Sequence, residues 1–110
     1  MAPVTLGEFE QIVLLAILRL GDHAYGVTIG EEIRNCTDRD PAPGALYVTL
    51  DRLEEKGLVA SHFGDPTPER GGRAKRYFEV SASGVEAVAR AQRAFQRLSR
   101  GLQLPGVANA

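Results

Sequence analysis

The chain is poor in cysteine, histidine and aromatic residues, and these shortages exclude several classes of protein. Its 110 residues include one cysteine, two histidines and no tryptophan. A single cysteine, Cys36, allows no internal disulfide and fits a reducing compartment. His23 and His62 stand far apart without ligand-spaced neighbours, which argues against a metal site. No acid, base or nucleophile is paired for catalysis, so we expect neither an enzyme nor a cofactor. Cys36 is read as a small boundary residue, and a redox role for it stays open.

Long apolar segments and an excess of charge are also lacking. The longest apolar run, residues 12–18, is far too short to span a bilayer, and residues 1–5 lack the basic region of a secretory signal. Both observations favour a cytoplasmic protein without a membrane partner. The formal net charge is −1, so any affinity for nucleic acid must come from local clusters of cations. A core of this size is small, and association with a second copy would help to stabilise it.

What the chain does contain is a clear order of helix and strand patterns. Apolar spacing and capping residues predict helices over 6–20, 25–35, 43–56 and 82–100, and strands over 58–63 and 75–80. Thr5 with Glu8 is expected to cap the first helix, and Ser81 the last. The predicted fold is mainly α with a small β-hairpin. Residues 1–80 form a winged helix-turn-helix domain, 81–102 a C-terminal dimerisation helix, and 103–110 a disordered tail.

The third predicted helix has the pattern of a recognition helix. Its leucines face the core, while its first turns are small and almost without charge, as entry into a DNA major groove requires. The residues that it offers to DNA are Gly44, Ala45, Tyr47, Val48, Thr49 and Arg52. The alanine and valine suit thymine methyl groups, the threonine suits a hydrogen bond, and the arginine suits a guanine or a phosphate. The alternative is that Tyr47 and Val48 pack inside and only Thr49 and Arg52 are exposed.

The loop between the two strands carries a cluster of cations. Between residues 67 and 78 there are four cations against one anion. They are Arg70, Arg73, Lys75 and Arg76. Lysine and arginine at such a hairpin tip bind phosphates and supply affinity without sequence information. The alternative is a solvated hairpin tip, which the preceding helix-turn-helix pattern disfavours.

The last predicted helix carries an apolar stripe that three helices and a hairpin leave without a partner. We expect it to form a homodimer contact, because symmetric dimers are the commonest oligomers. The residues proposed for this interface are Val85, Val88, Phe95, Leu98 and Leu102. The two winged helix-turn-helix domains of such a dimer suit a palindromic site on double-stranded DNA.

The ordered set of these motifs resembles the PadR family of transcriptional regulators. The segments that carry the resemblance are 14–18, 23–26, 44–47, 50–59 and 72–78, followed by Gly84. The resemblance implies a dimeric winged helix-turn-helix regulator of the small type with a single C-terminal helix. It also implies that Tyr25 opens the second helix and joins the DNA-binding residues, that 44–53 is the recognition helix, and that Arg73, Lys75 and Arg76 belong to the wing.

Three residues depart from the family pattern. Val48 stands where the family usually has proline, Phe78 where it has tyrosine, and Ser81 where it has threonine. The valine is expected to alter the tilt or the base preference of the recognition helix. The chain has no tryptophan, so the aromatic drug-binding pocket of some small members is not indicated.

Together these patterns predict a homodimeric DNA-binding transcriptional regulator, a repressor released by an unknown signal. A small-molecule effector at an apolar dimer interface would act by changing the angle between the two DNA-binding domains. The main alternative is a winged-helix protein-interaction module without direct DNA binding. It is supported by the net charge of −1 and by the acidic second helix.

Overall fold

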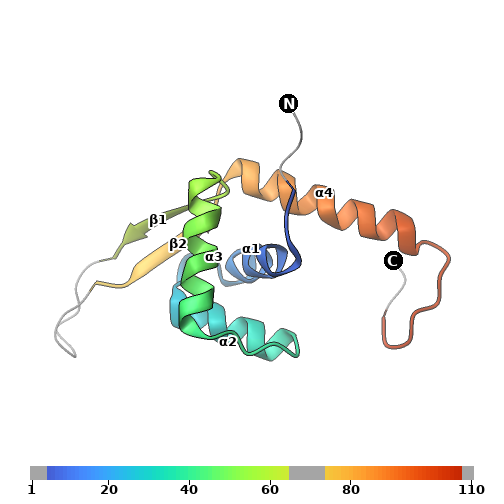
Figure 1. The fold of residues 1–110 in the computed structure, drawn as a ribbon, viewed down its shortest axis with the longest axis horizontal. Coiled ribbons are helices and arrows are strands. Elements are labelled where there is room, and N and C mark those ends of the chain that lie inside the picture. Colours follow the sequence, from blue (N-terminus) through green and yellow to red (C-terminus); the bar gives the residue numbers. More distant parts are fainter. Residues whose placement is uncertain (1–4, 65–73, 108–110) are drawn as a thin grey trace.

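Four α-helices and one β-hairpin make up the computed structural model, which describes residues 5–64 and 74–107. The order along the chain is α1 (Glu8–Leu20), the 3₁₀ turn η1 (Gly21–His23), α2 (Gly26–Cys36), α3 (Pro43–Glu55), β1 (Val59–Phe63), β2 (Arg76–Val80) and α4 (Ala82–Ser99), as Figure 1 shows. The predicted elements are confirmed, with ends that differ by one or two residues. The fold class is therefore mainly α with a small hairpin.

The start of α1 differs from the prediction. Gly7 rather than Thr5 precedes the helix, and its N–H donates to the Glu10 carboxylate over 2.9 Å. Lys56, which follows α3, donates to the other oxygen of Glu10 over 2.8 Å. Because Glu10 is held from both sides, the helix begins two residues later than the Thr5–Glu8 pattern predicts.

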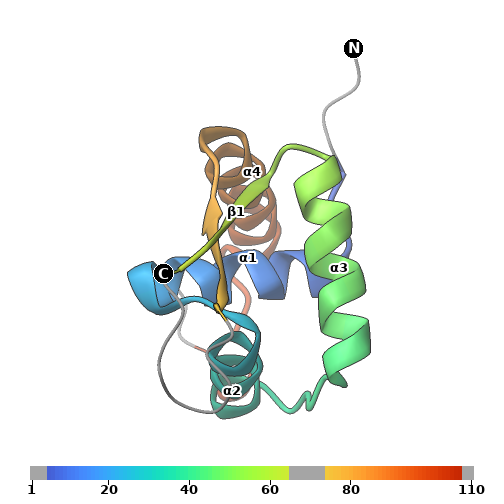
Figure 2. The ribbon, with the colours of Figure 1, turned by 90° about the vertical axis from the view of Figure 1, so that its left-hand side faces the viewer.

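The core forms around α1, which contacts α2, α3, α4 and β2. Figure 2 shows α1 between α2 below, α3 to one side and α4 above. Each surrounding element contributes apolar side chains that α1 alone could not bury. The fully buried large side chains are Val13, Leu14, Ile17, Ile29, Ile33, Leu50, Leu53, Leu58 and Phe78. Because other elements surround α1 on several sides, its sequence is apolar nearly all round.

The hairpin is attached to the helix-turn-helix as well as to itself. Its strands pair antiparallel from Val59↔Val80 to Phe63↔Arg76. The N–H of Phe78 donates to the carbonyl of Ala24 over 2.9 Å, and Tyr25 forms a bridge with Tyr77. The base of the wing is therefore fixed to the segment that precedes α2.

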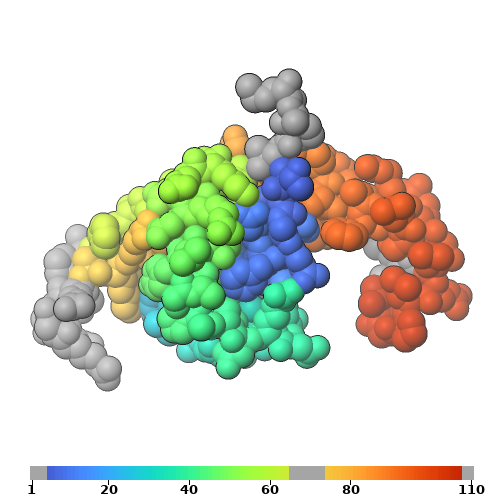
Figure 3. All heavy atoms as spheres, viewed as in Figure 1, coloured from blue at the N-terminus to red at the C-terminus, as the bar shows by residue number. Residues whose placement is uncertain are grey.

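The first turn of α4 packs tightly on the hairpin, and its second half projects from the body (Figures 1 and 3). Ser81 caps the helix as predicted, because its hydroxyl accepts from the Gly84 N–H over 3.1 Å. A Cβ at Gly84 would lie 2.2 Å from the Leu58 carbonyl oxygen, so only glycine fits there. This contact fixes where α4 leaves the hairpin.

The segment after α4 is described as far as Val107, where the N–H of Val107 donates to the Leu104 carbonyl in a turn. The rest of the tail that the sequence predicts as disordered, 108–110, lies outside the described residues. Within the described ranges, no helix has the length and apolar character needed to cross a bilayer.

Candidate nucleic-acid interface

α3 lies on the outer surface of the molecule and presents its first two turns to solvent (Figures 1 and 2). Leu46, Leu50 and Leu53 are buried against the body. Five of the six residues of α3 that the sequence predicts to contact DNA are exposed. These are Gly44, Ala45, Tyr47, Val48 and Arg52. The small size of these first-turn side chains leaves the backbone of α3 accessible to a groove.

Thr49 corrects one of the sequence predictions. It is only 7% exposed, because it follows Leu46 by three residues and precedes Leu53 by four, which places it on the inner face of α3. Val48 is instead 56% exposed. In this turn of α3 the side chain that faces solvent is therefore Val48, and Thr49 does not reach the outer surface.

Tyr47 packs on α2 and also reaches the surface. Its ring lies against Gly26, where an added Cβ would come within 2.2 Å of the phenolic oxygen. Beside it Val27 of α2, which the sequence analysis did not single out, is exposed. Val27 lies outside the 26, 29, 30 and 33 spacing of the buried face, and that offset is the signal by which the sequence identifies it as exposed. Val27 and Tyr47 line a shallow groove between α2 and α3.

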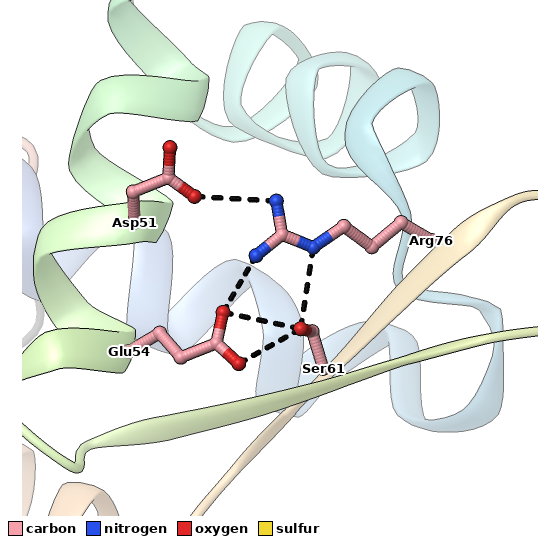
Figure 4. A network of polar contacts seen from close by, with 4 residues as sticks. All are labelled: Asp51, Glu54, Ser61 and Arg76. Carbon is pink, nitrogen blue, oxygen red and sulfur yellow. Dashed lines mark hydrogen bonds and ion pairs between the residues drawn. The ribbon is translucent and has the colours of Figure 1, made fainter.

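Arg76 corrects a second prediction, because it is part of a network between β2 and α3 (Figure 4). Its guanidinium donates to Glu54 over 2.6 Å, to Asp51 over 3.2 Å and to the Ser61 hydroxyl over 3.2 Å. The side chain is only 27% exposed. The structure thus places Arg76 between the hairpin and the recognition helix, and its charge is neutralised within the chain instead of facing outward.

The structure describes two of the predicted wing cations, Lys75 and Arg76, and of these two Lys75 remains exposed at the surface. Its ammonium lies 4.4 Å from the centroid of the Tyr25 ring, and it donates to the Tyr25 hydroxyl over 3.4 Å. Tyr25 in turn meets Tyr77 edge to face at 5.5 Å. Arg70 and Arg73 lie outside the described residues. The structure therefore brings Tyr25 and Lys75 together at the base of the wing.

The charges along α3 divide it into two halves. Asp51, Glu54 and Glu55 make its second half acidic, and Arg76 neutralises part of that charge. Arg52 forms no ion pair with the described residues and lowers the pKa of Glu10 by its charge. Contact with a polyanion is therefore favoured at the first two turns of α3 and at Lys75.

The sequence and the fold match a known family. A sequence model described as the transcriptional regulator PadR-like family matches residues 14–90. The chain belongs to this PadR-like family. A Lysinibacillus sphaericus protein named "Uncharacterized protein X" is 30% identical over 80 residues, which cover 71% of this chain and 69% of the relative.

Solved structures of PadR-family proteins share the fold. A PadR family transcription regulator from Clostridium difficile R20291 superposes with a TM-score of 0.68 at 21% identity, covering 83% of this chain and 91% of that one. A Streptococcus transcriptional regulator gives a TM-score of 0.66 at 25% identity, covering 83% and 84%. The family consists of transcription regulators and not of enzymes, so this PadR-like protein is a winged-helix DNA-binding regulator.

The predicted apolar stripe of the PadR-like chain is only partly exposed. Phe95 and Leu98 are exposed, as is Val85 near the start of α4, and Leu98 reaches 78% exposure. Leu102, also exposed, lies beyond the end of α4 at Ser99. Val88 is only 4% exposed, because it shares the inner face of α4 with Gly84 and Ala87, which packs on α1. The assignment of Val88 to a dimer interface is therefore wrong, while the other four residues face solvent in the single chain.

Cys36, His23 and His62 of the PadR-like chain were considered as potential metal ligands. No group of three or more potential metal ligands occurs among residues 5–64 and 74–107. The Cys36 thiol is exposed and donates to the Glu32 carboxylate over 3.3 Å, which raises the pKa of the thiol. A raised pKa lowers the thiolate fraction and makes the thiol less reactive.

Proposed function

We propose that this PadR-like regulator binds a palindromic operator as a homodimer and represses transcription until a signal releases it. The observation that carries the proposal is the surface formed by the first two turns of α3 beside the base of the wing. Both parts face solvent, and neither is covered by another of the helices and strands that the structure describes. The first two turns of α3 suit contact with a major groove, and the base of the wing suits contact with the phosphates next to it.

In this proposal the residues have separate tasks on DNA. Ala45 and Val48 contact thymine methyl groups at base edges, where an apolar side chain discriminates thymine. Tyr47, with its ring fixed on Gly26, donates its hydroxyl to a phosphate, and Arg52 reaches a guanine or a phosphate. Lys75, together with Arg70 and Arg73, contacts the flanking phosphates and fixes the register without reading sequence.

The homodimer is proposed to form through the exposed part of the α4 stripe. Phe95 and Leu98 lie on the half of α4 that projects from the body. Burial of apolar surface stabilises association by roughly 25 cal/mol for each Å² removed from water. A twofold dimer would place two copies of α3 about 34–36 Å apart, which is the spacing of successive major grooves on one side of the duplex.

The test is a fluorescence anisotropy titration of the full chain with duplexes from immediately upstream of its own gene, at two salt concentrations. The expected result is selective binding by a dimer that weakens steeply as salt rises, because phosphate contacts release counterions. Light scattering of the same sample gives the mass of the complex. Equal affinity for random duplexes, or an affinity that does not respond to salt, would support a protein-interaction module instead.

The sign of regulation needs a separate measurement. A reporter driven by the bound promoter should be more active when the gene for this chain is absent, and lower reporter activity in its absence would indicate an activator. The releasing signal is proposed to change the angle between the two DNA-binding domains of the dimer. An effector must bind one dimer geometry more tightly than the other to do so.

A further inference from the structure

A cavity lies between the end of α1, the turn η1 and the strand β2. Its volume is about 340 Å³, and ligand pockets in proteins hold roughly 300–1,000 Å³. Side chains alternate along β2, so Tyr77 and Glu79 lie on the face opposite Arg76, whereas Phe78 and Val80, which also line the cavity, share the face of Arg76. None of the described residues assigned above to DNA or to the dimer contact lines the cavity.

Apolar and aromatic side chains form the walls of this cavity. Ile17, Leu18 and Val80 line it from α1 and β2, and Leu18 is among the exposed large apolar side chains of the chain. The Tyr77 ring is fixed between Tyr25, edge to face at 5.5 Å, and His62, stacked at 5.7 Å. A ring held on two sides needs no ordering when a ligand arrives, which lowers the entropic cost of binding.

The charges at the cavity are of one sign. Asp22 of η1 and Glu79 of β2 line it beside His62, and no lysine or arginine among the described residues does. Neither carboxylate forms a hydrogen bond or an ion pair with the residues that the structure describes. Some carboxylates on the described surface differ in this respect, since Glu32 and Glu54 are each paired with an arginine, and what sets Asp22 and Glu79 apart from other unpaired carboxylates is that both line the cavity. Two uncompensated carboxylates beside apolar walls favour a ligand that combines positive charge with an apolar body.

We propose that this cavity binds a small organic cation, with its ammonium or amidinium group at Asp22 and Glu79 and its apolar body against Leu18, Val80 and Tyr77. An inorganic cation suits the cavity less well, because Asp22 and Glu79 belong to no group of three or more potential metal ligands among the described residues. The inference does not rest on DNA binding or on dimerisation. It can therefore fail or succeed independently of the proposed function.

The test is a titration of the full ¹⁵N-labelled chain with benzyltrimethylammonium, followed by NMR. The expected result is saturable shifts of the amides of residues 17–22 and 77–80, with weaker or no effect from the neutral benzyl alcohol and the anionic phenylacetate. Shifts spread over the whole surface, or equal shifts with all three probes, would overturn the proposal.

Variants test the role of charge. The double variant Asp22→Asn with Glu79→Gln should weaken binding about tenfold, because an exposed ion pair contributes roughly two- to fivefold in affinity. The matched control, Asp38→Asn with Glu31→Gln, removes the same two charges from exposed sites away from the cavity and should bind as the parent does. Equal affinity of the two double variants would overturn the proposal.

A second substitution keeps the test decisive if the carboxylates also support folding. Leu18→Lys places a cation at the apolar wall and should abolish binding of benzyltrimethylammonium, whereas Leu18→Met should preserve it. Unchanged binding by Leu18→Lys would show that the probe does not occupy this cavity. The amide spectrum of each variant reports at the same time whether the fold is intact.

Discussion

The guanidinium of Arg76 donates to the Glu54 carboxylate over 2.6 Å and so joins strand β2 to helix α3 (Figure 4). The Ser61 hydroxyl donates to the same carboxylate over 2.9 Å. The wing and the recognition helix are thus fixed to each other by one network. Their relative position on DNA depends on it.

Removing Arg76 should therefore affect stability rather than the electrostatic affinity for DNA. We expect Arg76→Met to lower the free energy of unfolding by about 1 kcal/mol, since the pair is partly exposed. Urea unfolding measures this loss. The salt dependence of DNA binding should stay as in the parent, and a clearly flatter salt slope would show that Arg76 does contact a phosphate.

Lys75 should behave in the opposite way. Lys75→Met removes a surface cation and should flatten the plot of log K against log salt by about 0.9 for each protomer, the effect of one phosphate contact. Its free energy of unfolding should change little. Anisotropy titrations at four salt concentrations measure the slope. A parallel line with unchanged slope would remove Lys75 from the interface.

Base preference should follow Val48 and not Thr49. Val48→Ala removes two exposed methyl groups and should reduce discrimination at one base pair by about 1 kcal/mol. Thr49→Val keeps the shape of a buried side chain and should leave the preference unchanged. Competition binding with operators substituted one base pair at a time checks both. A changed preference in Thr49→Val alone would contradict the burial of this residue.

Gly84 should be intolerant of any side chain. In Gly84→Ala the new Cβ would lie 2.2 Å from the Leu58 carbonyl oxygen and 2.6 Å from Val80 Cγ1, so the start of α4 must shift. We expect a loss of roughly 1–3 kcal/mol in unfolding free energy, although alanine is the better helix former. Ser83→Ala, at the exposed neighbouring position, is the control and should be nearly neutral.

Stability should fall in acid in a way that depends on Glu10. Burial raises the pKa of Glu10, but hydrogen bonds from Lys56 and the Gly7 N–H and the charges of Lys56 and Arg52 lower it below its usual value. A carboxyl whose pKa is lowered on folding stabilises the fold above the unfolded pKa, and this contribution is lost as pH falls through the folded pKa. The difference in unfolding free energy between the parent and Glu10→Gln should therefore be larger at pH 7 than at pH 3.5. An equal difference at both pH values would contradict this account.

The helices and strands were predictable because their signals are local. Ser81 caps α4, Pro43 begins α3, and Gly57 follows it with a positive φ of 75°, each for reasons contained in a few neighbouring residues. The exposed positions of α3 were predicted except for Thr49. Its spacing from Leu46 and Leu53 fits the buried face, but a threonine is equally compatible with solvent, so composition alone could not decide.

The errors concern residues whose partners are distant in the sequence. The cap at Gly7 depends on Lys56, which fixes Glu10 from 46 residues away. The neutralisation of Arg76 depends on the hairpin register, which places it opposite Phe63 and within reach of α3. Val88 is buried because α4 crosses α1 at its first half and projects beyond it.

The sequence by itself determined the order of elements, the family and the chemical character of the recognition helix, because periodicity, caps and motif spacing act over short range. Only the tertiary structure decided which cations remain at the surface, which half of α4 is exposed, and that Asp22 and Glu79 line one cavity. Those outcomes arise from side chains that meet only when the chain folds, and their electrostatic balance depends on distances that no local pattern encodes.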